Sequence, residues 1–279
     1  MLRAAAKLNL GLHLGARRGD GLHELRSLFC SLSLADRLLV ADAPGDADEV
    51  VCAGVEGPNL VTTALEVLRA RGWDHPPVRV EIEKRIPVAA GLGGGSSDAA
   101  AILRHLAGER SDLAAIAAGL GADVPSQLAP GLALVAGAGE RVEALPAPAE
   151  FAVVLIPLQP GLRATDVFEQ ADRLRLGHDA AELEAIESRL RAAAAEGASP
   201  LRYADLLSND LERAVLSLRP EVAESLAALE AAAAAVALVT GSGPTAFGLF
   251  EDIAAADRAA ASLPPRFADA IVSAPQRFL

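Results

Sequence analysis

A glycine-rich segment between two regular patterns constrains the fold of this chain more than any other feature of its sequence. The preceding run VRVEIEKRI, residues 78–86, alternates apolar and charged residues with the period of a strand that has one buried face. The following run AAAILRHLAG, residues 99–108, predicts a helix that begins near Ser96 and ends at Gly108. The segment between them therefore connects a strand to the N-terminus of a helix.

This segment, IPVAAGLGGGSS, carries glycine at positions 91, 93, 94 and 95, followed by two serines. Glycine leaves no Cβ between the chain and a ligand, and the first N–H groups of a helix lack internal partners, so such a terminus attracts phosphate. A tight connection capped by Ser96 or Ser97 is the alternative. The segment fits neither the Walker pattern, because no lysine lies inside it, nor the dinucleotide fingerprint, because Ser96 stands where a glycine is needed. We therefore predict a phosphate-binding loop of a third kind.

The composition is that of a folded protein. The chain has 279 residues, 52% hydrophobic and 22% charged, which is enough for a large core and for two domains. Its net charge of -12 argues against nucleic acid or an anionic membrane as partner. Two cysteines are too few for a disulfide framework, and neither a secretory signal nor an apolar run of about 20 residues occurs. We expect a cytoplasmic protein that is a monomer or a weak homodimer.

Strand and helix patterns are interspersed along the first half of the chain, which predicts an α+β fold. Strands are predicted over residues 4–14 and 27–40, besides 78–86, and two short strands surround a glycine turn in 132–145. A helical pattern covers residues 57–72.

A change of composition at PAPAE, Pro146–Glu150, predicts a domain boundary, with an N-terminal domain over residues 1–148 and a C-terminal domain over 149–279. The second half opens with an apolar run and contains a helical pattern over residues 220–235. It also contains two strand-like runs around Gly241–Pro244.

Two charged residues in apolar surroundings are candidates for chemistry. Asp123, in GLGADVPS, is the only carboxylate between Asp112 and Glu140 and is either a helix cap or a functional group. Lys7, in the first strand, lies on the polar side of a row of leucines and is either solvated or functional. Spacing alone does not decide between these roles.

Five motifs occur in a fixed order: AAAKLNLGLHL, RRGDGLHELRSLF, IPVAAGLGGGSSDAA, LGADVPS and TGSGPTAFGLF. Together they resemble the 4-(cytidine 5'-diphospho)-2-C-methyl-D-erythritol kinases, which belong to the superfamily of galactokinase, homoserine kinase, mevalonate kinase and phosphomevalonate kinase (the GHMP kinases). The glycine segment alone indicates only the superfamily, and the matches run from Lys7 to about Phe250. The resemblance implies a ribosomal-protein-S5-like N-terminal domain and a ferredoxin-like C-terminal domain, with the active site between them.

The reaction that the resemblance implies is transfer of the ATP γ-phosphoryl group to the 2-hydroxyl of the methylerythritol substrate, a step of the non-mevalonate isoprenoid pathway. In that family the aspartate matching Asp123 accepts the hydroxyl proton and the lysine matching Lys7 lies beside it. This is physically coherent, because an ammonium keeps a carboxylate ionised and stabilises charge on the attacking oxygen. Mg²⁺ is expected from the use of ATP, with a loop serine as possible ligand, although the sequence offers no clear metal constellation.

The resemblance also assigns binding residues. Asn59 would lie near the adenosine, although it could instead cap its helix. His23 could otherwise be a surface histidine, Phe168 a core residue and the glycines at 241 and 243 part of a hairpin turn. The implied ATP-binding residues are Lys84, Pro87, Val88, Ala89, Ala90, Gly91, Leu92, Gly93, Gly94, Gly95, Ser96, Ser97, Asp98 and Asn59, and the implied substrate-binding residues are Asn9, His23, Phe168, Gly241, Ser242 and Gly243.

One departure from the family pattern keeps alternatives open. The family commonly has a tyrosine that stacks on the cytosine, and this chain has Leu22 at that position, which removes one aromatic face. Another small-alcohol kinase of the superfamily, of homoserine or mevalonate type, is the nearest rival. A regulator that kept the nucleotide fold without turnover is the rival from another class.

Overall fold

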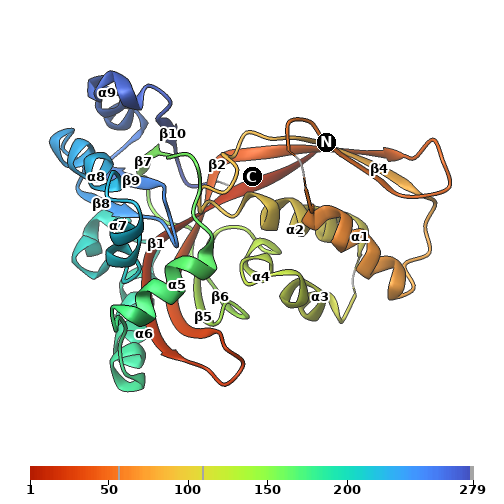
Figure 1. Ribbon diagram of the computed structural model, residues 1–279, viewed down its shortest axis with the longest axis horizontal. Coiled ribbons are helices and arrows are strands. Elements are labelled where there is room, and N and C mark those ends of the chain that lie inside the picture. The colour runs from red at the N-terminus through yellow and green to blue at the C-terminus, as the bar shows by residue number, and fades with distance from the viewer. Residues whose placement is uncertain (56, 109, 277–279) are drawn as a thin grey trace.

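The computed structural model describes residues 1–55, 57–108 and 110–276, and the described chain forms two sheets with helices around them (Figure 1). In the first sheet the strand order is β3-β4-β2-β5-β6, and β1 pairs antiparallel with β2. Only the β3–β4 pair is parallel. The strands of this sheet are β1 (Leu2–Arg17), β2 (His23–Asp42), β3 (Glu49–Cys52), β4 (Val78–Glu83), β5 (Leu132–Gly137) and β6 (Arg141–Leu145).

Four helices cover one end of this sheet: α1 (Leu60–Ala70), α2 (Gly94–Leu106), α3 (Leu113–Leu120) and α4 (Val124–Gln127). The alternation of residues 78–86 is confirmed, because Val78, Val80 and Ile82 are buried in the core beneath α1 and α2. Helix α2 begins two residues before the predicted Ser96. Gly93 adopts a left-handed backbone with φ of 65°, and the next two glycines already form the first turn.

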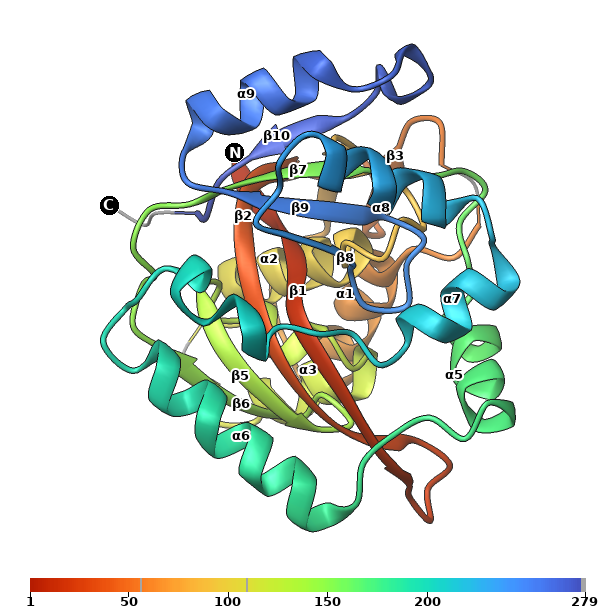
Figure 2. The same cartoon turned by 90° about the vertical axis from the view of Figure 1, so that its left-hand side faces the viewer.

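The second sheet has the antiparallel order β10-β7-β9-β8 (Figure 2). One of its faces packs against α8 and α9, and the other faces β1 and β2. Helix α8 ends before the predicted residue 235, because the chain turns at Ala233 with φ of 62°. The elements of this half are β7 (Ala152–Ile156), α5 (Ala164–Arg173), α6 (Ala180–Ala194), η1 (Pro200–Leu206), α7 (Glu212–Leu218), α8 (Val222–Ala231), β8 (Val236–Val239), β9 (Ala246–Phe250), α9 (Ile253–Ser262), η2 (Pro265–Phe267) and β10 (Ile271–Ser273).

Strand β1 lies between the two halves and is buried on both faces. Leu8 and Leu10 join a core cluster that also contains Phe151 and Phe247 from the second sheet. The polar face is covered too, since Lys7 is only 4% exposed, so the solvated role for this lysine is wrong. The domain boundary at residues 146–150 stays a prediction; it falls in the connection between β6 and β7.

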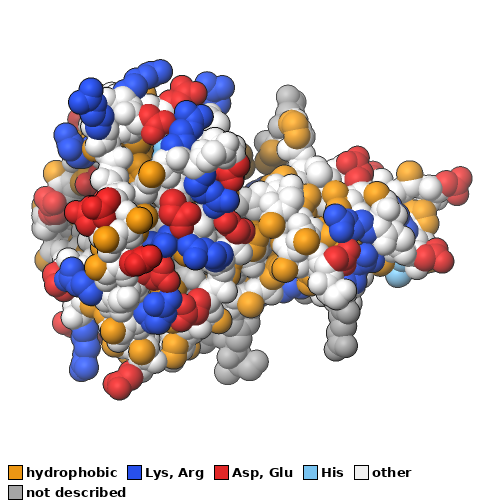
Figure 3. Space-filling view, turned by 90° about the horizontal axis from the view of Figure 1, so that it is seen from below, with side chains coloured by type: hydrophobic (Ala, Val, Ile, Leu, Met, Phe, Trp, Pro, Cys, Tyr) orange, Lys and Arg blue, Asp and Glu red, His pale blue; other side chains and the backbone are white. Residues whose placement is uncertain are grey.

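The surface carries charges of both signs. On the face shown in Figure 3, acidic and basic side chains are interspersed over the wider part of the molecule. In the described part of the chain, no helix combines the length and the apolar character that a membrane crossing requires. Charges of both signs are therefore mixed on this face of the molecule.

Candidate active site

The glycine loop, residues 87–97, encloses a cavity of about 360 Å³, which we call the loop cavity. Two of its glycines, Gly91 and Gly93, lie where a side chain would meet close neighbours. A Cβ on Gly91 would lie 2.8 Å from the carbonyl oxygen of Gly243, and one on Gly93 would lie 3.2 Å from Cβ of Lys7. The loop backbone thus fits between the hairpin β8–β9 and strand β1. The loop cavity is lined by Cys52, Val55, Pro58, Asn59, Leu60, Lys84, Pro87, Val88, Ala89, Ala90, Gly91, Leu92, Gly93, Gly94, Gly95, Ser96 and Asp98.

A buried charge cluster supports the base of this loop. Lys84 Nζ bonds to Asp36 and lies 2.9 Å from Asp98 Oδ2. Asp36 is fully buried and also accepts the backbone N–H groups of Arg85 at 2.6 Å and Ile86 at 2.8 Å. These bonds fix the chain where it leaves β4 and enters the glycine loop.

The two carboxylates of the cluster share one cation, Lys84. Burial raises the pKa of Asp98 to about 7, and Asp36 adds to this effect although Lys84 opposes it. Burial alone would lower the pKa of Lys84, but the charges and hydrogen bonds of Asp98 and Asp36 raise it. Lys84 therefore stays protonated, and Asp98 is the member of the cluster that titrates near neutral pH.

Lys7 and Asp123 form an ion pair directly beside the glycine loop. Lys7 Nζ lies 3.1 Å from Asp123 Oδ2, and the backbone N–H of Lys7 donates to the carbonyl of Leu92 at 2.9 Å. Asp123 precedes α4, but its side chain makes no capping hydrogen bond, so the cap role is wrong. The carboxylate is 31% exposed, against 5% for the lysine side chain, and it faces a cavity.

Asn9 fixes the orientation of the lysine. Its Oδ1 accepts from Lys7 Nζ at 2.8 Å, and its Nδ2 donates to Ser27 Oγ at 2.9 Å. Its backbone N–H donates to Thr240 Oγ1 at 2.9 Å, which connects β1 to the hairpin of the second sheet. The lysine also lies over the ring of Phe29, 4.8 Å from the centroid. Because every one of these groups is buried, the ammonium is held in one place.

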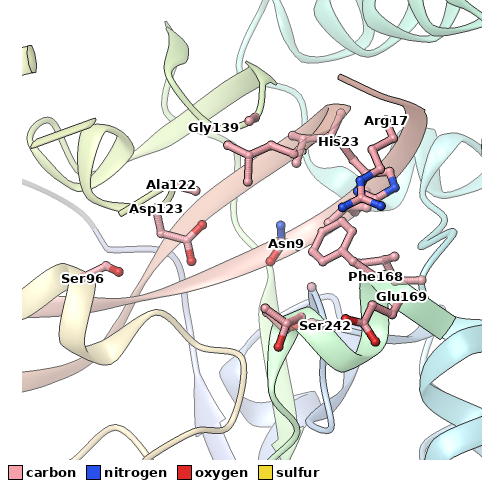
Figure 4. A pocket seen from close by; sticks show the side chains of 18 of the residues that line it. Asn9, Arg17, His23, Ser96, Ala122, Asp123, Gly139, Phe168, Glu169 and Ser242 are labelled. Atoms are coloured by element: carbon pink, nitrogen blue, oxygen red, sulfur yellow. The ribbon is translucent and has the colours of Figure 1, made fainter. Parts of the chain in front are cut away.

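A second cavity, of about 430 Å³, extends away from this ion pair, and we call it the central cavity. Figure 4 shows Asp123 and Ser96 at one end and His23, Arg17 and Phe168 at the other. Ser96 lines both cavities, so the two spaces meet where the ion pair lies. A ligand in the central cavity can therefore reach both the carboxylate and the far group of side chains.

His23 and Phe168 lie together at the far end of the central cavity. Their rings stack with centroids 5.2 Å apart and an interplanar angle of 24°. His23 is 8% exposed, so it is not a surface histidine, and its Nε2 bonds to Asp172 Oδ1 at 2.7 Å. Leu22, at 54% exposure, lines the same cavity. Phe168 also packs against the core beneath α5, which confirms the core role considered for it, while its contact with a base stays a prediction.

Models of known families match both halves of the chain. "GHMP kinases N terminal domain" matches residues 59–131, and "GHMP kinases C terminal" matches residues 180–269. A 4-diphosphocytidyl-2-C-methyl-D-erythritol kinase of Streptomyces coelicolor is 40% identical over 264 residues, which cover 90% of this chain and 87% of that protein. The chain belongs to this kinase family.

Solved structures agree with the assignment. A crystal structure of a 4-(cytidine 5'-diphospho)-2C-methyl-D-erythritol kinase is 36% identical, with a TM-score of 0.77 and 99% of each chain covered. A homoserine kinase from Cytophaga hutchinsonii is 19% identical with a TM-score of 0.70, over 99% of this chain and 93% of that one. The second likeness shows the shared fold alone, and the α+β kinase fold expected from the sequence is confirmed.

Most residues that the family resemblance implies lie at these two cavities. Asn59 lines the loop cavity and also caps α1, accepting the N–H of Val61 at 2.9 Å, so both of its roles are compatible. Ser97 does not line either cavity: it is 1% exposed and its hydroxyl donates to Gln127 at 3.4 Å. Gly243 lies against the glycine loop, whereas Gly241 and Ser242 line the central cavity.

Three residues of the site have no signal in the sequence. Asp36 is one charged residue in a strand, and only the fold brings it to the base of the glycine loop. Asp172 reaches His23 across 149 positions, and Ser27 supports Asn9 from the neighbouring strand. Such contacts between segments that are remote in the sequence cannot be predicted from local periodicity.

Proposed function

We propose that this chain phosphorylates 4-(cytidine 5'-diphospho)-2-C-methyl-D-erythritol at its 2-hydroxyl with ATP, a step of the non-mevalonate isoprenoid pathway. One observation carries the proposal: the Lys7–Asp123 ion pair lies where the loop cavity meets the central cavity. A triphosphate held by the glycine loop and an alcohol held in the central cavity would meet at this pair. The family membership supports the same substrate.

Asp123 would act as the general base. Its carboxylate would accept the proton of the acceptor hydroxyl while that oxygen attacks the terminal phosphorus of ATP. Lys7, fixed 3.1 Å away, would stabilise negative charge on the attacking oxygen. Base catalysis of this kind typically contributes a factor of about 10² to 10⁴ to the rate enhancement. Positioning of the two substrates by the two cavities would supply much of the remaining rate enhancement.

The glycine loop would hold the phosphates through backbone N–H groups at the N-terminus of α2. This helix has 13 residues, and its first residues, Gly94 and Gly95, have no side chain between the backbone and a ligand. Asn59, at the other side of the loop cavity, would lie near the adenosine.

Mg²⁺ is compatible with the residues at this end of the loop cavity. Asp98 Oδ1 is buried and has no hydrogen-bond partner within the described residues, and the cavity lining also includes Ser96. Hard oxygen ligands of these two kinds suit Mg²⁺. The ion would neutralise phosphate charge, and these two residues would hold it.

The far end of the central cavity would bind the cytidine. His23 offers a ring nitrogen to a base edge, and Phe168 offers an aromatic face. Because Leu22 supplies no second aromatic face, the base would be stacked on one side only, with weaker affinity than a two-sided stack gives.

An acceptor panel tests the proposal. The purified protein would be incubated with ATP and either the cytidylated methylerythritol, homoserine or mevalonate, and ADP release would be measured. We expect release only with the cytidylated substrate. Release with homoserine or mevalonate instead would favour the nearest rival, and no acceptor-dependent release would favour the regulator. Location in the cytoplasm and a monomeric or weakly dimeric state remain predictions from the sequence.

A further inference from the structure

A cluster of potential metal ligands lies outside the two cavities. His13 is in β1, His178 is in the connection between α5 and α6, and Asp210 is in the connection between η1 and α7. One ligand atom of each residue lies within 4.8 Å of those of the other two. His178 Nε2 and Asp210 Oδ2 are 3.1 Å apart. Three segments that are remote in sequence thus bring two imidazoles and one carboxylate to one point.

This cluster is separate from the catalytic machinery. An irregularity in the β1–β2 register lies between Asn9 and Gly11, and beyond it Leu12 lines the central cavity. The next residue of the strand, His13, points to the opposite face, because successive side chains of a strand alternate. There its ring lies 6.0 Å from the ring of His178, centroid to centroid.

The backbone around the cluster is fixed by hydrogen bonds between the same three segments. Leu12 exchanges bonds with the η1–α7 connection, donating to Ser208 O at 2.8 Å and accepting from Asp210 N at 2.9 Å. Leu14 accepts from His178 N at 2.8 Å and donates to Asp210 Oδ2 at 2.8 Å. The ligand atoms are therefore preorganised by strand-like pairing rather than by flexible loops.

His13 is a buried imidazole whose nitrogens are poorly used. It is 5% exposed, and its Nε2 has no hydrogen-bond partner among the residues that the structure describes. The side-chain contact that its Nδ1 makes, with Ser208 Oγ, is long at 3.5 Å, and the backbone of Leu206 also lies within hydrogen-bonding reach of the ring. A buried polar atom without a partner is unfavourable, so a ligand that accepts its lone pair would remove this penalty. Burial lowers the pKa of His13, which keeps the ring in the neutral form that binds metals.

We propose that His13, His178 and Asp210 bind one divalent transition-metal ion of the zinc class, with solvent in the fourth position. In a tetrahedral site with bonds of 2.0–2.1 Å, neighbouring ligand atoms are about 3.3 Å apart. The pair of His178 and Asp210 already has nearly this separation. Two imidazoles and one carboxylate suit zinc rather than magnesium. The side chain of His178 is 32% exposed, which gives the ion a route from solvent.

Glu182 completes the site as an orienting residue. Its Oε2 lies 3.5 Å from His178 Nδ1, the arrangement in which a carboxylate orients a metal-binding imidazole. The bound ion would tie β1 to the segments that precede α6 and α7. Leu12 and Leu211, each next to a ligand in sequence, line the central cavity, so the ion would stiffen one wall of it.

Cobalt titration of the full-length, nucleotide-free protein tests the site, because tetrahedral Co²⁺ absorbs strongly in the visible range and octahedral Co²⁺ does not. We expect one equivalent of Co²⁺ to give the tetrahedral spectrum and excess Zn²⁺ to remove it. His178→Ala should weaken binding at least about 100-fold, and Glu182→Gln about tenfold, in line with the loss of an orienting partner. His105→Ala, an exposed histidine on α2, is the matched control and should bind like the wild type.

The unfolding temperature provides a second readout, since a ligand of the native state raises it. Zn²⁺ should raise the unfolding temperature of the wild type and of His105→Ala, but not that of His178→Ala. Because His178 is partly exposed, we expect this variant to fold. A wild type that gives no tetrahedral spectrum, or a spectrum that persists unchanged in His178→Ala, would overturn the proposal. In either case the three residues would be only a hydrogen-bonded cluster.

Discussion

Replacing Gly93 by alanine tests whether the glycine loop and the catalytic pair work as one unit. Gly93 has φ of 65°, and a Cβ there would lie 3.2 Å from Cβ and 3.3 Å from Cε of Lys7. Lys7 is held by its backbone bond to Leu92 and by Asn9, so its side chain can yield only by moving relative to Asp123. A shift of about 1 Å between reacting groups can cost on the order of 10²-fold, and a shift of several tenths of an ångström should cost about tenfold in kcat.

Gly72→Ala is the matched control for this substitution. Gly72 has φ of 77°, and a Cβ there would meet nothing within 4 Å. Both variants carry the cost of a left-handed alanine, roughly 1–2 kcal/mol, and both should lose about 2–8 °C of unfolding temperature. Only Gly93→Ala should lose kcat, measured as ADP release at saturating ATP and acceptor. If its kcat stays within about twofold of that of Gly72→Ala, the close contact between loop and lysine does not matter for catalysis.

Three further substitutions test other parts of the account. Leu22→Tyr should lower KM for the cytidylated acceptor about two- to tenfold without changing kcat, because a second aromatic face adds about 0.5–1.5 kcal/mol to the binding of the base. An unchanged KM would contradict one-sided stacking. Asp36→Asn should lower the free energy of unfolding by about 3 kcal/mol in urea titrations, because Lys84 loses one of its two buried partners. A loss below about 1 kcal/mol would contradict the stabilising role of Asp36. The pKa of Asp98 is raised from 3.8 to about 7 in the folded state, so the folded state binds this proton more tightly than the unfolded state does. The contribution of Asp98 to the free energy of unfolding therefore falls as the pH rises from 3.8 to about 7, and it does not change further above pH 7. Asp98→Asn should remove this decline, which is measured as the urea midpoint of unfolding against pH. If the midpoints of the wild type and the variant change alike with pH, the assignment is refuted.

Local periodicity was sufficient to predict the elements that form the catalytic end. The alternation of Val78, Val80 and Ile82 and the four glycines of the loop predicted the strand, loop and helix in the order that the structure has them. The start of α2 was predicted two residues late because a left-handed Gly93 ends the loop, a backbone state that the sequence does not specify. The motif resemblance identified Lys7 and Asp123, whose partnership no spacing indicates.

Contacts between remote segments could not be predicted. The burial of β1 on both faces depends on segments that are remote in sequence, so the strand looked as if Lys7 faced water. Asp36 lies 48 residues before its partner Lys84, and Asp172 lies 149 residues after His23. The cluster of His13, His178 and Asp210 has the same origin, since each member is unremarkable in its own segment. Such contacts are set by the tertiary fold, which hydrophobic periodicity and composition do not specify.

The central claim is that Asp123 accepts the proton of the acceptor hydroxyl beside Lys7. The direct test is the single-turnover rate of phosphoryl transfer to the cytidylated methylerythritol by Asp123→Asn, with ATP affinity measured on the same protein by calorimetry. The amide keeps the size of the side chain and leaves the glycine loop untouched, so ATP affinity should stay within about threefold while the rate falls about 10²- to 10⁴-fold. A rate equal to that of the wild type would contradict the claim.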